Sequence, residues 1–230
     1  MPGSADLETW KVILQAVTAV GGVVGIGWTI IWAIRGPRLR ISLLDSRGYP
    51  TRYGDSPEAP PAFFYHLRVR NIRKWTANHV RAKITKLTKK YKGQINWEQR
   101  TPVCLVWAPL PSPKLYLLDV LGLDEEACNL GFIIKGRSFQ LDAMDPARVG
   151  QNEKWPPGFD GFVHADETMQ LELVAVGENA RSNTLYLEIT WDGQWYDQPE
   201  EMQKHLVVST RRPGALASVR SRLGFGSPGA

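Results

Sequence analysis

The chain carries two different patterns of hydrophobic and polar positions. Residues 12–34 form an unbroken hydrophobic run without a charged residue, whereas after Pro37 apolar and polar residues alternate in short runs, as in residues 38–44. A long uncharged run is typical of a membrane-spanning helix, and a period of two is typical of strands with one buried face. We therefore predict one N-terminal transmembrane helix followed by an all-β domain over residues 37–212.

The uncharged segment has the length of a bilayer. As a helix its 23 residues would span about 34 Å, against a hydrocarbon core of about 30 Å. Trp10 and Trp32 stand near its two ends, where indole rings favour the headgroup region. The short flank 1–11 contains two acidic residues and lacks the basic start and the cleavage site of a signal peptide. We expect the segment to be kept as an anchor.

Basic residues are distributed unequally around this segment. Lys11 stands alone before it, whereas five arginines follow it, at Arg35, Arg38, Arg40, Arg47 and Arg52. Because lysine and arginine accumulate on the cytoplasmic side of membrane helices, this asymmetry predicts that the N-terminus lies outside and the β domain lies in the cytoplasm. The predicted location is the inner (cytoplasmic) membrane, with a single pass.

Small residues within the segment suggest contact between two such helices. Gly21 and Gly25 form a GxxxG pair, which lets helix backbones approach closely and would make the chain a homo-oligomer. Glycine is also common in membrane helices that have no helical partner, so self-association is one of two interpretations.

The alternation after Pro37 predicts an antiparallel β-sandwich. Regular strands are expected over residues 63–70, 80–85, 169–175 and 185–191, and less regular ones over 103–107, 115–121, 128–134, 138–141 and 206–209. One short helix is expected from a cap at Asp197, with Pro199 and Glu200 in its first turn, through Lys204. Residues 142–166 are predicted to be mostly loop, and residues 213–230 are predicted to be a disordered tail.

Two stretches resemble a known family. The run Phe64-Tyr65-His66-Leu67-Arg68-Val69-Arg70-Asn71, followed by Ala77 and Val80, resembles the strand-and-turn pattern of CARDB-type, immunoglobulin-like modules, although the usual glycine after Asn71 is missing. The segments 185–195 and 200–202 are similar to uncharacterised bacterial single-pass proteins that carry such a domain. The resemblance implies an immunoglobulin-like fold and a bacterial setting, and it implies no activity.

Basic residues are concentrated between Glu58 and Glu98, where no acidic residue occurs. The candidates for an anion-binding surface are Arg68, Arg70, Arg81, Lys83, Lys89 and Lys90. We expect Arg68 and Arg70 to lie on a strand next to that of Arg81 and Lys83, facing solvent. Such a face could be a solvated sheet surface, could contact anionic lipid, or could bind an acidic protein or nucleic acid. Sparse aromatic residues argue against nucleic acid.

Other residues give little indication of chemistry. The two cysteines, Cys104 and Cys128, are interpreted as buried free thiols. The alternative, which requires an oxidising compartment, is one disulfide between them. The four histidines have no metal-ligand spacing, and no phosphate-binding or nucleophile motif occurs, so no cofactor is predicted. We expect a membrane-anchored, non-catalytic interaction protein that binds the bilayer and an unknown protein partner. An exported ligand-binding or adhesion module is the alternative, and an enzyme with an unrecognised site is the third choice.

Overall fold

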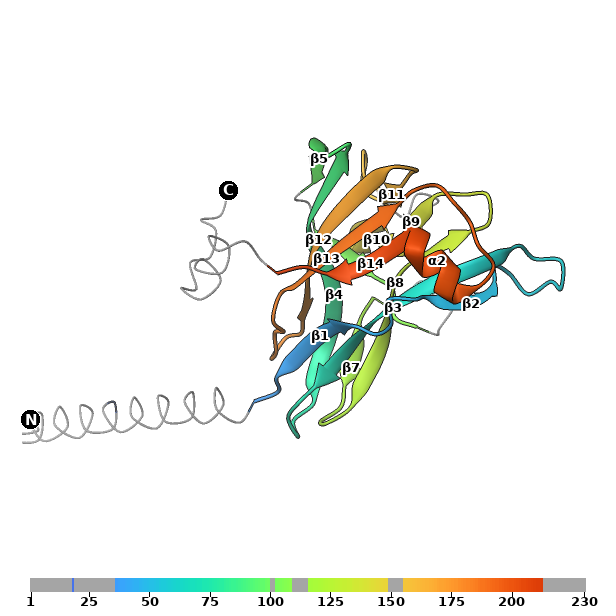
Figure 1. The fold of residues 1–230 in the computed structure, drawn as a ribbon. Helices are drawn as coiled ribbons and strands as arrows, with labels where there is room; N and C mark the ends of the chain where they lie inside the picture. The colour runs from blue at the N-terminus through green and yellow to red at the C-terminus, as the bar shows by residue number, and fades with distance from the viewer. Residues whose placement is uncertain (1–17, 19–35, 100–101, 109–115, 149–154, 213–230) are drawn as a thin grey trace, which may run out of the picture.

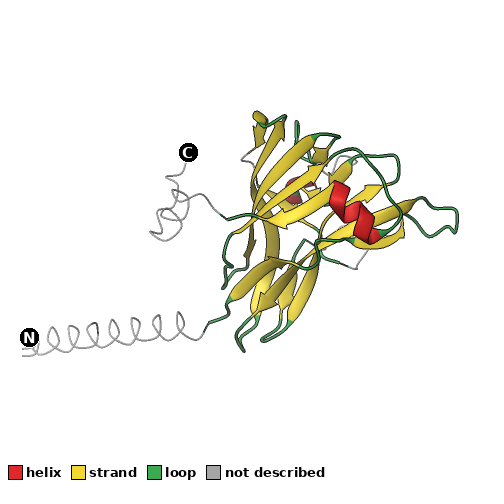
Figure 2. Ribbon diagram, viewed as in Figure 1, coloured by secondary structure: helices red, strands yellow, loops and turns green. Residues whose placement is uncertain are grey.

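Two antiparallel sheets make up most of the protein. The computed structural model describes residues 18, 36–99, 102–108, 116–148 and 155–212. In these ranges strands dominate and helix is confined to short pieces (Figure 2). Every strand pairing is antiparallel. The prediction of an all-β antiparallel domain is therefore confirmed.

The first sheet contains six strands. Its order is β1 (Leu39–Leu43), β3 (Pro61–Asn71), β8 (Glu125–Ile134), β9 (Phe139–Leu141) and β11 (Phe162–Val163), and β2 (Tyr49–Arg52) also pairs with β3.

The second sheet contains eight strands. Its order is β10 (Ala143–Met144), β6 (Val103–Leu105), β4 (Ala77–Tyr91), β12 (Glu167–Val176), β13 (Leu185–Trp191) and β14 (Leu206–Thr210), and β5 (Gln94–Gln99) and β7 (Leu118–Val120) also pair with β4. The helix α2 (Pro199–His205) leads directly into β14, and a 3₁₀ turn covers Pro146–Arg148 (Figure 1).

The core lies between the two sheets. On β3 the side chains of Phe63, Tyr65, Leu67 and Val69 are buried, and on β13 the odd positions 185–191 are buried. Alternate side chains of a strand point to opposite faces, so each strand contributes one apolar row to this core. The residues that the sequence assigned to the buried faces of these two strands are thus placed correctly.

An irregularity in the pairing of β4 with β12 changes the phase of β4. Glu172 of β12 pairs with Lys86, but the next residue, Leu173, pairs with Ile84, so Thr85 is an extra residue. Such a bulge shifts all later side chains to the opposite face. Val80, Ala82 and Ile84 are buried before it, whereas Leu87 and Lys89 are buried after it. The regular alternation read from the sequence therefore ends at residue 85.

Several local predictions were wrong or incomplete. Strands β2, β5, β10 and β11 were not foreseen, and the strand expected at 115–121 is only Leu118–Val120 among the described residues. The helix cap was also misplaced. Gln198 is the N-cap residue, and Asp197 instead accepts hydrogen bonds from Trp195 Nε1 (2.8 Å) and Lys135 Nζ (3.1 Å). These donors lower the pKa of Asp197.

Among the residues that the structure describes, no helix combines the length and the apolar character that crossing a bilayer requires. The predicted membrane helix over residues 12–34, with Gly21 and Gly25, falls outside the described residues apart from Thr18. The flank 1–11 and the tail 213–230 also fall outside them.

Candidate functional site

The predicted basic surface is divided between two sheets. Arg68 and Arg70 lie on β3 of the first sheet, whereas Arg81 and Lys83 lie on β4 of the second. The expectation that these strands are neighbours was wrong, because the chain crosses from one sheet to the other between residues 71 and 77. Arg68 also forms an ion pair with Glu125 at 3.4 Å. The four residues consequently do not form one continuous positive face.

Lys89 is a buried structural residue rather than a surface cation. Its side chain is 2% exposed, and its ammonium group lies 2.7 Å from Asp160 and 2.9 Å from Glu167. The bulge at Thr85 turns it inward, while its neighbour Lys90 stays half-buried. A buried lysine needs such carboxylate partners because an unpaired charge is costly to desolvate. Lys89 therefore joins the loop at Asp160 to β4, and it is not available to an anionic partner.

The free edge of β1 is blocked by a side chain. Two backbone hydrogen bonds, from Leu44 N to His66 O (3.0 Å) and from Ile72 N to Arg38 O (2.9 Å), set the pairing pattern of β1 with β3. In this pattern the N–H and C=O groups of the even-numbered residues of β1 point toward β3, so those of Ile41 point outward. The amide of Asn183 meets it there: Ile41 N donates to Asn183 Oδ1 (3.3 Å), and Asn183 Nδ2 donates to Ile41 O (3.5 Å). Asn183 thus takes the place of a neighbouring strand.

Other edges are blunted differently. β2 carries Pro50, which lacks the N–H that an added strand would need. β10 and β11 are only two residues long.

The edge of β14 has none of these devices. Its five residues include neither proline nor a charged side chain, and among the described strands it pairs with β13 alone. Bonds from Asp192 N to His205 O (3.3 Å) and from Arg211 N to Tyr186 O (3.0 Å) fix the pattern of its ladder. Because the pattern has a period of two, the backbone groups of Val208 and Thr210 face away from β13. An open edge of this kind is a template for another strand.

A groove runs along this edge. It has a volume of about 560 Å³, within the usual range for ligand sites. Its lining comes from the end of β1 and the following turn on one side and from α2 and β14 on the other: Leu43, Leu44, Asp45, Ser46, Gln203, Val207, Val208, Ser209 and Thr210.

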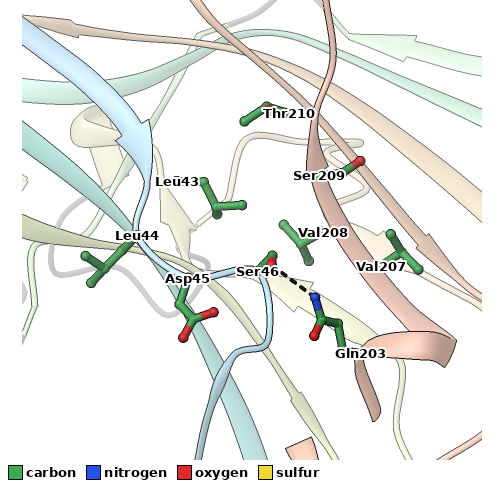
Figure 3. Close-up of a pocket in the computed structure, with 9 residues that line it drawn as sticks. All are labelled: Leu43, Leu44, Asp45, Ser46, Gln203, Val207, Val208, Ser209 and Thr210. Carbon is green, nitrogen blue, oxygen red and sulfur yellow. Dashed lines mark hydrogen bonds between the residues drawn. The ribbon is translucent and has the colours of Figure 1, made fainter. Parts of the chain in front are cut away.

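Side chains give this groove an apolar middle and a polar end. Leu43 and Val208 project toward each other from the two sides, and Gln203 Nε2 donates to Ser46 Oγ at 3.1 Å (Figure 3). An arginine also holds the turn, because Arg47 N donates to the Asp45 carboxylate at 2.9 Å and this bond lowers the pKa of Asp45. The edge strands β1 and β14 therefore approach each other here without pairing as neighbouring strands of one sheet.

The sequence did not identify this groove. Each half of it is an ordinary strand in the hydrophobic pattern, and the two halves are more than 150 residues apart in the chain. The one available signal was the composition of residues 206–210, a strand with no charged or proline residue at the end of a domain.

Both cysteines are free, so the disulfide considered for an oxidising compartment was wrong for this structure. Cys104 and Cys128 are buried on β6 and β8, and burial raises the pKa of each thiol. A thiol that is buried and protonated is a poor nucleophile and metal ligand. Within the described ranges, no group of three or more His, Cys, Asp or Glu side chains could hold a metal ion.

Comparison with protein-family models, curated proteins and solved structures finds no match to this chain. The resemblance to CARDB-type modules thus stays a prediction from two short stretches of sequence.

Proposed function

We propose that this chain is a membrane-anchored, non-catalytic interaction protein whose β-sandwich, of immunoglobulin-like type, binds an extended segment of a partner protein along β14. The observation that supports this most is the contrast among the edges: a capping side chain, a proline and short strand length protect β1, β2, β10 and β11, whereas β14 has none of these. In such strand addition, main-chain hydrogen bonds provide affinity and alternate side chains provide specificity.

The groove suits an extended chain better than a compact ligand. Val208 and Thr210 offer two outward-facing sets of amide and carbonyl groups, and successive outward residues on a strand are about 7 Å apart. A bound segment would place every second side chain beside the apolar surface of Leu43 and Val208. The partner is therefore expected to contribute small or medium apolar residues at alternate positions.

The membrane anchor of the proposal is the segment 12–34, with the N-terminus outside and the sandwich in the cytoplasm. Anchoring would hold the β14 edge near the membrane and raise its effective concentration toward partners confined there. Self-association through Gly21 and Gly25 is a separate part of the proposal. Gly21→Leu together with Gly25→Leu should then reduce chemical crosslinking between copies.

Two measurements test the main proposal. Full-length protein mixed with lipid vesicles should float with them in a density gradient. The purified chain should then select ten-residue peptides from a random library, and a selected peptide should lose binding when alternate backbone nitrogens are methylated. Methylation at the intervening nitrogens is the matched control and should be tolerated. A peptide that is sensitive to side-chain changes only, with no alternation in the methylation scan, would exclude strand addition.

A further inference from the structure

Exposed apolar side chains gather at one end of the sandwich, at a place distinct from the groove. Ile72 and Trp75 lie in the crossing from β3 to β4, and Leu121 and Leu123 lie in the turn from β7 to β8. Their exposed fractions are 42%, 54%, 57% and 56%. We name these four residues the apolar tip. Contiguous exposed apolar residues mark contact sites, because soluble surfaces rarely keep them without a use.

Hydrogen bonds hold the two segments of the tip together. Leu123 N donates to Arg73 O at 2.9 Å. Below them Asn71, which is fully buried, donates from Nδ2 to Trp75 O (2.6 Å) and to Val120 O (3.2 Å). Gly122 fits only because it lacks a side chain, since a Cβ there would clash with the carbonyl oxygen of Lys74. The tip is therefore a built feature and not an incompletely packed loop.

The backbone at Leu123 is unfavourable for leucine. Its φ is +65°, in a turn closed by the bond from Asp124 N to Leu121 O. Glycine or asparagine is the usual residue at such a position, because a leucine side chain strains the left-handed conformation. Because the side chain of Leu123 is exposed, its burial does not offset this backbone strain. Strain of this kind is characteristic of functional sites.

The tip lies where the chain enters the sandwich. Arg38, directly before β1, accepts a hydrogen bond from Ile72 N at its carbonyl oxygen (2.9 Å) and donates from its own N to Asn71 Oδ1 (3.3 Å). Figure 1 places the start of β1 and the ends of β3 and β7 at the same end of the molecule. Arg38 follows Ile34 by four positions, a span of at most about 14 Å. The headgroup layer beyond the hydrocarbon core is about 5–7 Å thick on each side.

We propose that the apolar tip inserts into the headgroup region of the bilayer and fixes the orientation of the sandwich on the membrane. This inference rests on the proposed anchor at residues 12–34. The short link from Ile34 to Arg38 keeps the end of that segment close to the tip. Isoleucine, leucine and tryptophan are residues that favour the boundary between headgroups and acyl chains.

Charge makes a secondary contribution to this contact. Arg38, Arg73 and Lys74 surround the tip and can meet phosphate groups. Acidic residues begin directly after it, at Asp124, and continue at Glu125 and Glu126. Because the two signs nearly balance, the apolar side chains and not the net charge should determine insertion.

Depth-dependent quenching in vesicles tests the proposal on the full-length chain. Leu121→Cys provides one accessible thiol, since Cys104 and Cys128 are buried, and it is labelled with an environment-sensitive fluorophore. Ile95→Cys, 63% exposed on β5, is the matched control. The label at position 121 should shift to shorter wavelength and be quenched several-fold more by shallow nitroxide lipids than the label at position 95, in neutral as well as in anionic vesicles.

A second variant separates insertion from mere tethering. Leu123→Asn suits the positive φ and removes one apolar side chain, so the fold should be kept while quenching at position 121 falls. If the protein floats with vesicles but both labels report water, or if Leu123→Asn leaves quenching unchanged, the inference is overturned and the anchor stands. If the full-length chain does not float at all, both the anchor and the inference are wrong.

Discussion

The edge strands β1 and β14 face each other across one groove, yet they differ in how their outward backbone groups are treated. On β1 the backbone of Ile41 is bonded at both N–H and C=O by the Asn183 amide. On β14 the outward groups of Val208 and Thr210 have no neighbouring strand among the described residues. Since natural sheets normally protect their edges, this difference supports the proposal that the β14 edge binds a partner strand.

The largest expected effect comes from closing the open edge. Thr210→Pro removes an outward N–H without touching the ladder to β13, so it should weaken binding of a selected peptide at least about tenfold, which corresponds to about 1.4 kcal/mol. Thr210→Val keeps the amide and is the matched control. Fluorescence anisotropy with the full-length chain measures both affinities. Equal affinities for the two variants would mean that this amide is not used.

Opening the closed edge should have the next largest effect. Asn183→Ala removes both side-chain bonds to Ile41, so the free energy of unfolding should fall by about 1 kcal/mol. The newly free edge should also promote self-association, seen by sedimentation as a concentration-dependent increase in mass. Thr184→Ala, one residue further on, is the control and should change neither quantity. A monomeric and fully stable Asn183→Ala protein would show that the β1 edge needs no protection.

A smaller effect is expected where the two sides of the groove touch. Gln203→Ala removes the bond to Ser46, which joins α2 to the turn after β1. The loss should be about 0.5 kcal/mol or less, because a hydrogen bond at the surface exchanges readily with water. Peptide binding should hold or improve as the groove widens. A strong loss of binding would instead make Gln203 a contact residue of the site.

Acidification should weaken the β1 side slightly through His66. His66, whose carbonyl pairs with Leu44 N, has a lowered pKa because burial disfavours its charged form, although Asn129 and Asp142 partly offset this. The unfolded chain therefore binds the proton more readily. Stability from His66 is complete above the ordinary histidine pKa of about 6.5 and is lost as the pH falls through the lowered pKa. Denaturant unfolding of His66→Gln should show a shallower decline over this range.

Regular strands could be predicted from the sequence because burial imposes a simple period. Phe63, Tyr65, Leu67 and Val69 followed it, and β3 lies where the pattern indicated. β4 departs from it after Thr85, since one extra residue inverts the faces and turns Lys89 from the expected surface into the interior. A bulge depends on the register with β12, which local sequence does not determine.

Contacts between distant segments were the other limit of prediction. The partnership of Asn183 with Ile41 joins residues 142 positions apart, and the groove joins β1 to β14. The apolar tip likewise depends on Asn71 holding two separate turns. Hydrophobic period identifies which residues are buried, but it does not identify which strand edges lack neighbours. The functional surfaces proposed for this chain are of that second kind.

Amide hydrogen exchange of the full-length chain, with and without a selected peptide, tests strand addition at β14 most directly. In the free protein the amides of Val208 and Thr210 should exchange faster than that of Ile41. The peptide should slow exchange at Val208 and Thr210 and leave Ile41 unchanged. Protection that appears at β1 while Val208 and Thr210 stay fast would contradict the account.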